Sequence, residues 1–137
     1  MKKILIISLL LFACSKNYYF PISNYSYEDF LLLKTDKIKM IDFYNNQCIP
    51  CVNFQKETLN TKDIVDFANK HLISIKIDAW DGNKGTSVWE NQYNGKSIPL
   101  IIFLDYDNNI IKEVVGNIDK HEFLAILNEV LNNIKNT

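Results

Sequence analysis

Residues 38–59 of the chain read IKMIDFYNNQCIPCVNFQKETL, and the structural interpretation starts from this stretch. Its first part, Ile38–Tyr44, is a nearly continuous apolar run, which is typical of a strand covered on both faces. Pro50 suits the first turn of a helix, because the N–H that proline lacks would have no partner there. The stretch therefore predicts a buried strand that leads directly into a helix, with the motif Cys48-Ile49-Pro50-Cys51 at the junction.

The two cysteines of this motif are candidates for redox chemistry. We expect Cys48 at the N-terminus of the helix, where unpaired N–H groups and the helix dipole favour a thiolate. We expect Cys51, one turn further along, to be more buried and to stay protonated. Such a pair can attack a disulfide through Cys48, form a mixed disulfide and resolve it through Cys51.

Other uses of a C-x-x-C motif are weighed against this one. Covalent haem attachment is excluded, because it needs a histidine where Val52 stands. A zinc site usually needs four ligands, and the sequence has no second C-x-x-C; His71 and His121 are far apart. A purely structural disulfide would stabilise the fold weakly, because so short a loop constrains the unfolded chain little. A metal site and a structural disulfide remain minor alternatives, and no metal is expected.

The N-terminus has the form of a signal peptide. Lys2 and Lys3 precede an apolar run, Ile4–Phe12, that is interrupted only by Ser8 and ends at the small residue Ala13. A membrane-spanning helix needs about 20 apolar residues, so this run is too short to be a good candidate. We therefore expect residues 1–13 to be removed.

Cys14 has a separate predicted role. Leu11-Phe12-Ala13-Cys14 resembles the lipobox of bacterial lipoproteins, in which the cysteine is acylated and becomes the first residue of the mature chain. Two acyl chains would give a stable membrane anchor, whereas one is marginal. The alternative is a secreted protein with a free thiol. We expect an extracytoplasmic, membrane-anchored lipoprotein, with residues 14–26 as lipidated N-terminus and tether.

The remaining chain, residues 27–137, is expected to form a single domain. The sequence has 137 residues, a formal net charge of -1 and 47% hydrophobic residues, which suit one packed core and exclude the basic footprint of a nucleic-acid partner. Asp81–Gly85 is interpreted as a loop without a bound ion. The predicted elements are a helix after Ser26, a strand at 38–44, helices after Pro50 and after Thr61, a strand around 73–77, a short helix around 88–93, a hairpin of strands 100–104 and 110–115, and a helix after Asp119.

This order predicts an α/β fold with a mixed β-sheet flanked by helices. From Lys37 to Leu131 the chain resembles the thioredoxin superfamily. Asp42 lies six residues before Cys48, where thioredoxins carry a buried carboxylate, and Ser97-Ile98-Pro99 is similar to the family's cis-proline loop. Tyr93 and Val115-Gly116 also match. The resemblance implies the thioredoxin fold, a βαβαββα core here preceded by an extra N-terminal helix, and thiol:disulfide oxidoreductase activity without a cofactor beyond the Cys48–Cys51 pair.

Within that superfamily, residues 43–59 look most like the C-terminal periplasmic domain of DsbD and its free-standing relatives. This likeness implies thiol or disulfide client proteins, a membrane electron donor and a reducing direction, although the sequence does not set the reduction potential. Clients would contact residues beside the cysteines and in the cis-proline loop: Gln47, Ile49, Pro50, Ile98 and Pro99. Two departures stand out: Gln47 replaces the usual tryptophan, and Ser74 replaces the lysine that partners the buried carboxylate.

Asp42 is also a candidate on its own chemistry. A carboxylate in an apolar strand is costly to bury, so its pKa should be raised, and it could then exchange a proton with Cys51. The alternative is a solvated aspartate without a task. For the whole chain, the alternative function is a non-catalytic thioredoxin-fold lipoprotein that binds a metal such as copper, or a protein partner.

Overall fold

The computed structural model describes residues 15–136. Their four strands form one mixed sheet in the order β2-β1-β3-β4. The central strand β1 (Ile38–Tyr44) pairs in parallel with β2 (Leu72–Asp78). On its other side β1 pairs antiparallel with β3 (Leu100–Leu104), which forms a hairpin with β4 (Ile110–Val115). The remaining elements are helical: α1 (Tyr27–Leu32), α2 (Ile49–Asn53), the π-helical η1 (Phe54–Leu59), α3 (Lys62–His71), α4 (Lys84–Ser87), the π-helical η2 (Val88–Gln92) and α5 (Lys120–Lys135).

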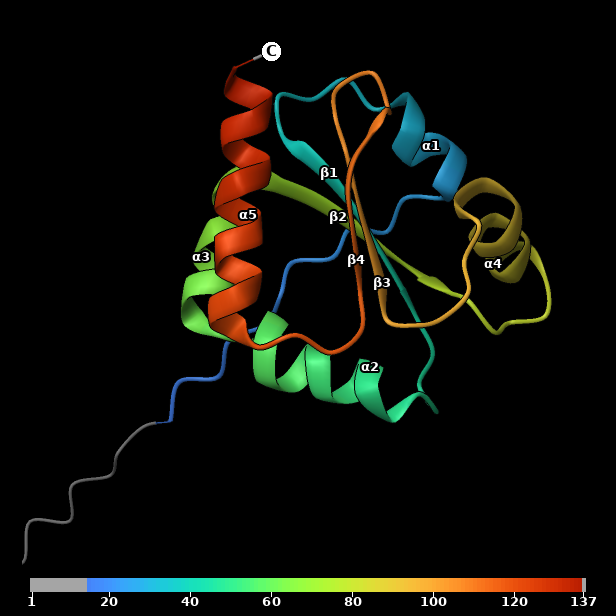
Figure 1. Cartoon of the computed structure of the whole chain (residues 1–137), viewed down its shortest axis with the longest axis horizontal. Helices are drawn as coiled ribbons and strands as arrows, with labels where there is room; N and C mark the ends of the chain where they lie inside the picture. The colour runs from blue at the N-terminus through green and yellow to red at the C-terminus, as the bar shows by residue number, and fades with distance from the viewer. Residues whose placement is uncertain (1–14, 137) are drawn as a thin grey trace, which may run out of the picture.

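Helices cover both faces of the sheet. Figure 1 shows α2, α3 and α5 on one side of the strands and α1 and α4 on the other. Successive β1 side chains point to opposite faces. Met40 therefore packs with Phe54 and Phe123 in one core, and Phe43 packs with Phe30 and Trp89 in the other. A strand buried on both faces explains the nearly continuous apolar run predicted at this position.

Most element boundaries agree with the sequence predictions. The strands at 38–44, 100–104 and 110–115 are confirmed, and α5 begins where Asp119 accepts hydrogen bonds from the backbone N–H groups of His121 and Glu122. Ser26 likewise caps α1 by accepting from the N–H of Asp29, at 3.1 Å. These capping contacts satisfy N–H groups that have no partner within their helix.

The interpretation of Asp81–Gly85 as a loop is partly wrong, because α4 begins at Lys84. The carboxylate of Asp81 accepts hydrogen bonds from the N–H groups of Gly85 and Thr86, at 3.0 and 2.9 Å. It therefore provides acceptors for N–H groups that have no partner within the helix, as an N-cap residue does. The sequence prediction missed this because Asp81 stands three residues before the helix begins.

The segment expected to be a tether is partly packed against the domain. Phe20 is buried in the core that also contains Met40, and its N–H donates to Oδ1 of Asn60 at 2.9 Å. The N–H of Ser23 donates to the carbonyl oxygen of Ser74, at the outer edge of β2, at 2.8 Å. The packed part of the chain therefore begins before Tyr27. The predicted signal peptide at residues 1–13 and the predicted lipid attachment at Cys14 lie outside the described residues.

Within residues 15–136, none of the helices has both the length and the apolar character that crossing a bilayer requires.

Candidate active site

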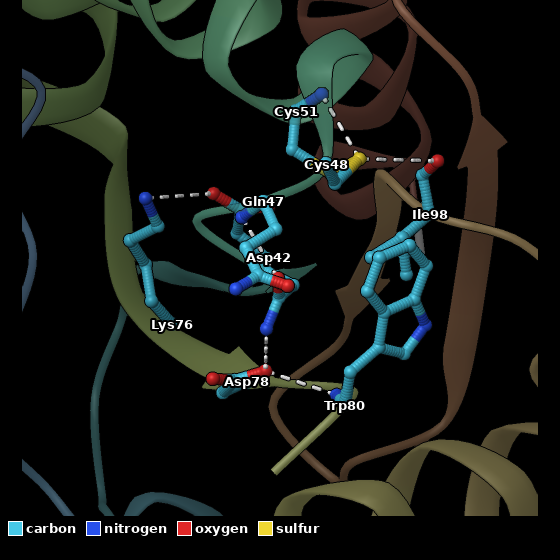
Figure 2. Close-up of a disulfide and its surroundings, with 9 residues drawn as sticks. Asp42, Gln47, Cys48, Cys51, Lys76, Asp78, Trp80 and Ile98 are labelled. Carbon is cyan, nitrogen blue, oxygen red and sulfur yellow. Dashed lines mark hydrogen bonds and ion pairs between the residues drawn. A yellow bond between two sulfur atoms is a disulfide. The ribbon is translucent and has the colours of Figure 1, made fainter.

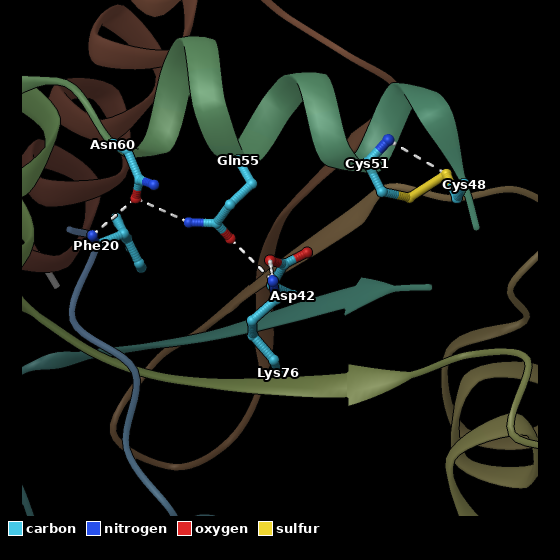
Figure 3. Close-up of polar contacts among 7 residues, drawn as sticks. All are labelled: Phe20, Asp42, Cys48, Cys51, Gln55, Asn60 and Lys76. Atoms are coloured by element: carbon cyan, nitrogen blue, oxygen red, sulfur yellow. Dashed lines mark hydrogen bonds and ion pairs between the residues drawn. A yellow bond between two sulfur atoms is a disulfide. The ribbon is translucent and has the colours of Figure 1, made fainter. Parts of the chain in front are cut away.

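The two cysteines of the motif form a disulfide at the start of α2. Cys48 is the residue that caps the helix and Cys51 lies in its first turn, with a Cα–Cα distance of 5.2 Å. The turn that leads into the helix is held by Asn45, whose Oδ1 accepts from the N–H of Gln47 at 2.8 Å. Figure 3 shows the disulfide at one end of a helix that continues through η1. The predicted junction of strand, motif and helix is confirmed.

Cys48 lies where a thiolate would be stabilised. Its Sγ accepts the N–H of Cys51 at 3.2 Å and lies 3.8 Å from the carbonyl oxygen of Ile98 (Figure 2). The Ile98–Pro99 peptide bond is cis, as the resemblance implied. The expectation that Cys51 is the more buried cysteine is wrong, because the exposed fractions are 5% for Cys48 and 6% for Cys51. Both cysteines belong to the core cluster that contains Ile98. The two residues therefore differ in their position in the helix and not in their burial.

The predicted substrate-contacting residues lie on both sides of the disulfide. Gln47, Ile49 and Pro50 are exposed on the helix side, and Ile98 and Pro99 are buried on the loop side. Ile49 stands out, because this branched apolar residue is 71% exposed next to the reactive pair.

Trp80 is a second exposed apolar residue near this site, at 52% exposure. It follows β2, and its N–H donates to Oδ1 of Asp78 at 2.9 Å. The same oxygen accepts from Nδ2 of Asn45 at 2.9 Å, so one carboxylate connects the Trp80 loop to the turn before the cysteines (Figure 2). Trp89 and Tyr93, by contrast, are buried.

Asp42 is a buried carboxylate, so the solvated alternative is wrong. Only 3% of the residue is exposed, and burial raises the pKa of its carboxyl group from 3.8 to about 6, while the nearby Lys76 ammonium opposes that rise. Asp42 points from β1 towards the helix that begins at the disulfide (Figure 3).

Asp42 has a lysine partner that the sequence prediction missed. Nζ of Lys76 lies 3.9 Å from Oδ2 of Asp42. In the parallel register Lys76 is directly opposite Asp42, whereas Ser74 is opposite Met40. The comparison with thioredoxins looked for the lysine partner of Asp42 only at the position of Ser74. The alternation of polar and apolar residues in β2 was the sequence pattern that could have indicated Lys76. The Ser74 hydroxyl is buried and has no hydrogen-bond partner within the described chain.

Gln55 and Asn60 were also missed. Nζ of Lys76 donates to Oε1 of Gln55 at 2.9 Å, and Nε2 of Gln55 donates to Oδ1 of Asn60 at 2.9 Å. All three line a cleft of about 280 Å³ that reaches Cys51. The sequence gives no signal of the contact between Gln55 and Lys76, because the lysine comes from a strand that is distant along the chain.

The carboxylate of Asp81 organises the loop after β2. Asp81 accepts four hydrogen bonds from Asn83, Gly85 and Thr86, and those from the backbone N–H groups lower the pKa of its carboxyl group to about 2. Over residues 15–136 no group of three or more His, Cys, Asp or Glu side chains is arranged to hold a metal ion.

Known proteins resemble the chain in sequence and structure. A family model described as a thioredoxin-like domain matches residues 31–131. The thiol:disulfide interchange protein DsbD of Pseudoalteromonas atlantica is 27% identical over 81 residues, which cover 59% of this chain and 13% of that protein. The chain therefore spans a small fraction of this relative's length.

Two solved structures have the same fold. A thioredoxin from Thermus thermophilus gives a TM-score of 0.70 at 17% identity and covers 85% of this chain and 88% of its own. The DsbD C-terminal domain of Neisseria meningitidis, in the reduced form, gives a TM-score of 0.57 at 19% identity, with 69% and 81% covered. The predicted fold class and the likeness to thioredoxins and DsbD are thus confirmed. Because the family model matches most of its length, the chain belongs to the thioredoxin-like family.

Proposed function

We propose that this protein is a thiol:disulfide oxidoreductase that exchanges disulfides with client proteins on the outer side of a cytoplasmic membrane. The observation that carries the proposal is the Cys48–Cys51 disulfide at a helix N-terminus, beside the cis-proline loop and above a buried carboxylate. The cycle needs no organic cofactor or metal, because the cysteine pair itself carries two electrons.

Cys48 is the proposed nucleophile. In the reduced protein its thiolate would be stabilised by the N–H of Cys51, which already donates to this sulfur in the disulfide form. The thiolate attacks one sulfur of a client disulfide, forms a mixed disulfide and releases the other client sulfur as a thiolate, which then takes up a proton. Cys51 then attacks Cys48 Sγ, which releases the second client thiol and regenerates the Cys48–Cys51 disulfide. The client is reduced by two electrons and the protein is oxidised by two.

Asp42 is the proposed acceptor of the Cys51 proton in the second step. A carboxyl group with a pKa of about 6 is mostly ionised near neutral pH, and yet it is a stronger base than an ordinary aspartate. Lys76 supports this role, because its charge offsets part of the cost of keeping the buried carboxylate ionised.

Clients are proposed to bind across the disulfide, between Gln47, Ile49 and Pro50 on one side and Ile98 and Pro99 on the other. The exposed apolar surface of Ile49 would be buried when a client segment binds. Trp80 would add an aromatic contact where the residue before Cys48 supplies none. Replacing Ile49 with serine should raise the KM for a folded client more than it lowers kcat, because it removes binding area and leaves the sulfur chemistry intact.

Membrane anchoring at Cys14, removal of residues 1–13 and a membrane electron donor belong to the same proposal. They are supported by the lipobox-like sequence and by the likeness to DsbD. Metabolic labelling with a radioactive fatty acid tests the anchor: the unaltered chain should be labelled and Cys14→Ala should not. Equal labelling of both chains would contradict it.

The direction of exchange is proposed to be reduction of clients. The test is equilibration of the protein with glutathione buffers of known potential. A value near the about -270 mV of thioredoxin supports a reductase, and one near the about -120 mV of DsbA overturns that direction.

The exchange activity itself is tested with an oxidised peptide whose disulfide holds a fluorophore beside its quencher. The reduced protein should open the peptide disulfide, and Cys48→Ser should abolish the fluorescence increase. If Cys48→Ser were as active as the unaltered protein, the proposal would be wrong. Cu(I) binding by a reduced protein that opens no disulfide would instead support the metal-binding alternative.

A further inference from the structure

A chain of polar contacts links the N-terminal segment to the buried carboxylate of the site. The N–H of Phe20 and Nε2 of Gln55 both donate to Oδ1 of Asn60, each at 2.9 Å. Oε1 of Gln55 in turn accepts from Nζ of Lys76 at 2.9 Å, and this nitrogen lies 3.9 Å from Oδ2 of Asp42. Figure 3 shows the chain running beneath the helix that carries the disulfide.

The orientation of Gln55 is fixed by its two partners. Its carbonyl oxygen must face the lysine, which only donates, and its amide nitrogen must face the acceptor oxygen of Asn60. Asn60 is oriented in the same way, because a backbone N–H points at its oxygen. Each amide therefore has one orientation that satisfies both neighbours, and reversing Gln55 would bring its NH₂ group against the ammonium.

Lys76 needs such support to act on Asp42. Its side chain is flexible and 24% exposed, so the ammonium could otherwise extend into the solvent of the cleft. Three groups hold it: the Gln55 oxygen, the Asp42 carboxylate and the ring of Tyr44, whose centre is 4.0 Å from Nζ. Removing the Gln55 oxygen leaves two contacts, neither of which is a hydrogen bond at normal distance.

We propose that Gln55 and Asn60 are positioning residues that hold the Lys76 ammonium beside Asp42 and thereby set the protonation of that carboxyl group. This rests on the proposed function, in which Asp42 accepts the Cys51 proton. The N-terminal segment joins the network at Phe20, so a packed part of the predicted tether contributes to the site.

The charged and titratable groups around Asp42 are few. Lys76 faces it from β2, Tyr44 shares its strand, and Cys51 lies on the helix above and does not titrate while it is in the disulfide. Lys56 lines the same cleft and is exposed, with no contact to Asp42. It is the matched control for loss of a positive charge.

The test is a carboxyl ¹³C NMR titration of Asp42 in the oxidised, full-length protein. Lys76→Met should raise the pKa of Asp42 by about 1 to 3 pH units, because a nearby positive charge favours the carboxylate. Gln55→Met keeps the length of the side chain without its amide, and it should raise the same pKa by a smaller amount. Asn60→Ala should act in the same direction, and Lys56→Met should leave the pKa unchanged.

An unchanged or lowered Asp42 pKa in Gln55→Met would overturn the proposal, provided that Lys76→Met raises it. If Lys76→Met also left it unchanged, the link between Lys76 and Asp42 would itself be refuted. Unfolding free energies of the same variants, measured in parallel, identify a purely structural role. Such a role would lower the free energy of unfolding without changing the pKa of Asp42. Because the titration uses the oxidised protein, its outcome is independent of whether Cys48 exchanges disulfides. Failure of the proposed function would appear only in the peptide assay.

Discussion

Replacing Asp42 with asparagine should stabilise the protein at neutral pH. In the folded chain the pKa of this carboxyl group is about 6, against 3.8 for an ordinary aspartate. The folded state therefore binds the proton more tightly than the unfolded state. Stability must fall as the pH rises from below the unfolded pKa to above the folded one. At 1.36 kcal/mol per pH unit, a difference of about 2 units costs about 3 kcal/mol once the group is fully ionised.

Asparagine removes this cost because it stays neutral. The difference in unfolding free energy between Asp42→Asn and the unaltered protein should be near zero below about pH 3 and approach about 3 kcal/mol at about pH 8. This figure already includes the attraction of the Lys76 ammonium, which lowers the pKa of Asp42 and so reduces the cost of ionising it. Urea denaturation of the oxidised proteins at several pH values measures the difference. Asp36→Asn is the control for the loss of an exposed negative charge.

A difference that is constant with pH would refute the assignment of a raised pKa to Asp42. A variant that is less stable at about pH 8 would show that the ion pair with Lys76 outweighs the cost of burying the carboxylate. The same variant also separates stability from activity. If Asp42 accepts the Cys51 proton, Asp42→Asn should slow release of the client from the mixed disulfide while it stabilises the fold.

Three further predictions concern the fold around the site. Phe20→Ala should lower the unfolding free energy by about 3 kcal/mol in urea denaturation, because a buried aromatic ring is lost; a change near zero would show that the segment only rests on the surface. Ser26→Ala should cost about 1 kcal/mol through loss of the α1 cap, and Ser26→Thr, which keeps the hydroxyl, should retain most of the stability. Asp81→Ala should speed amide hydrogen exchange at Gly85 and Thr86 and leave α5 unaffected; unchanged exchange would refute the capping role.

The features predicted correctly are those that depend on neighbours in the sequence. The apolar run before the cysteines, the hairpin of strands 100–104 and 110–115 and the helices that begin after Ser26 and after Asp119 are all local patterns, and each is present at the predicted position. The cis peptide at Ile98–Pro99 was implied by resemblance to a family and not by local chemistry.

The features that were missed depend on contacts between distant segments. Lys39 interrupts an apolar strand and is fully buried, because its Nζ donates to the carbonyl oxygen of Leu31 and to Oδ1 of Asn108. No local pattern shows that a turn so far along the chain supplies an acceptor. Lys76 was missed for a similar reason, since its role depends on the register between two strands. The burial of Phe20 was missed because the segment that contains it is rich in Asn, Ser and Tyr with one Pro, a composition typical of a linker.

The most direct test of the central claim is covalent trapping of clients by single-cysteine variants. Cys51→Ser leaves the proposed nucleophile without its resolving partner and should accumulate mixed disulfides that migrate as larger species on non-reducing gels and disappear on reduction. Cys48→Ser, matched in size and polarity, should accumulate none. Mass spectrometry should place every client bond at Cys48. Adducts formed equally through Cys51, or absent from both variants, would contradict the account.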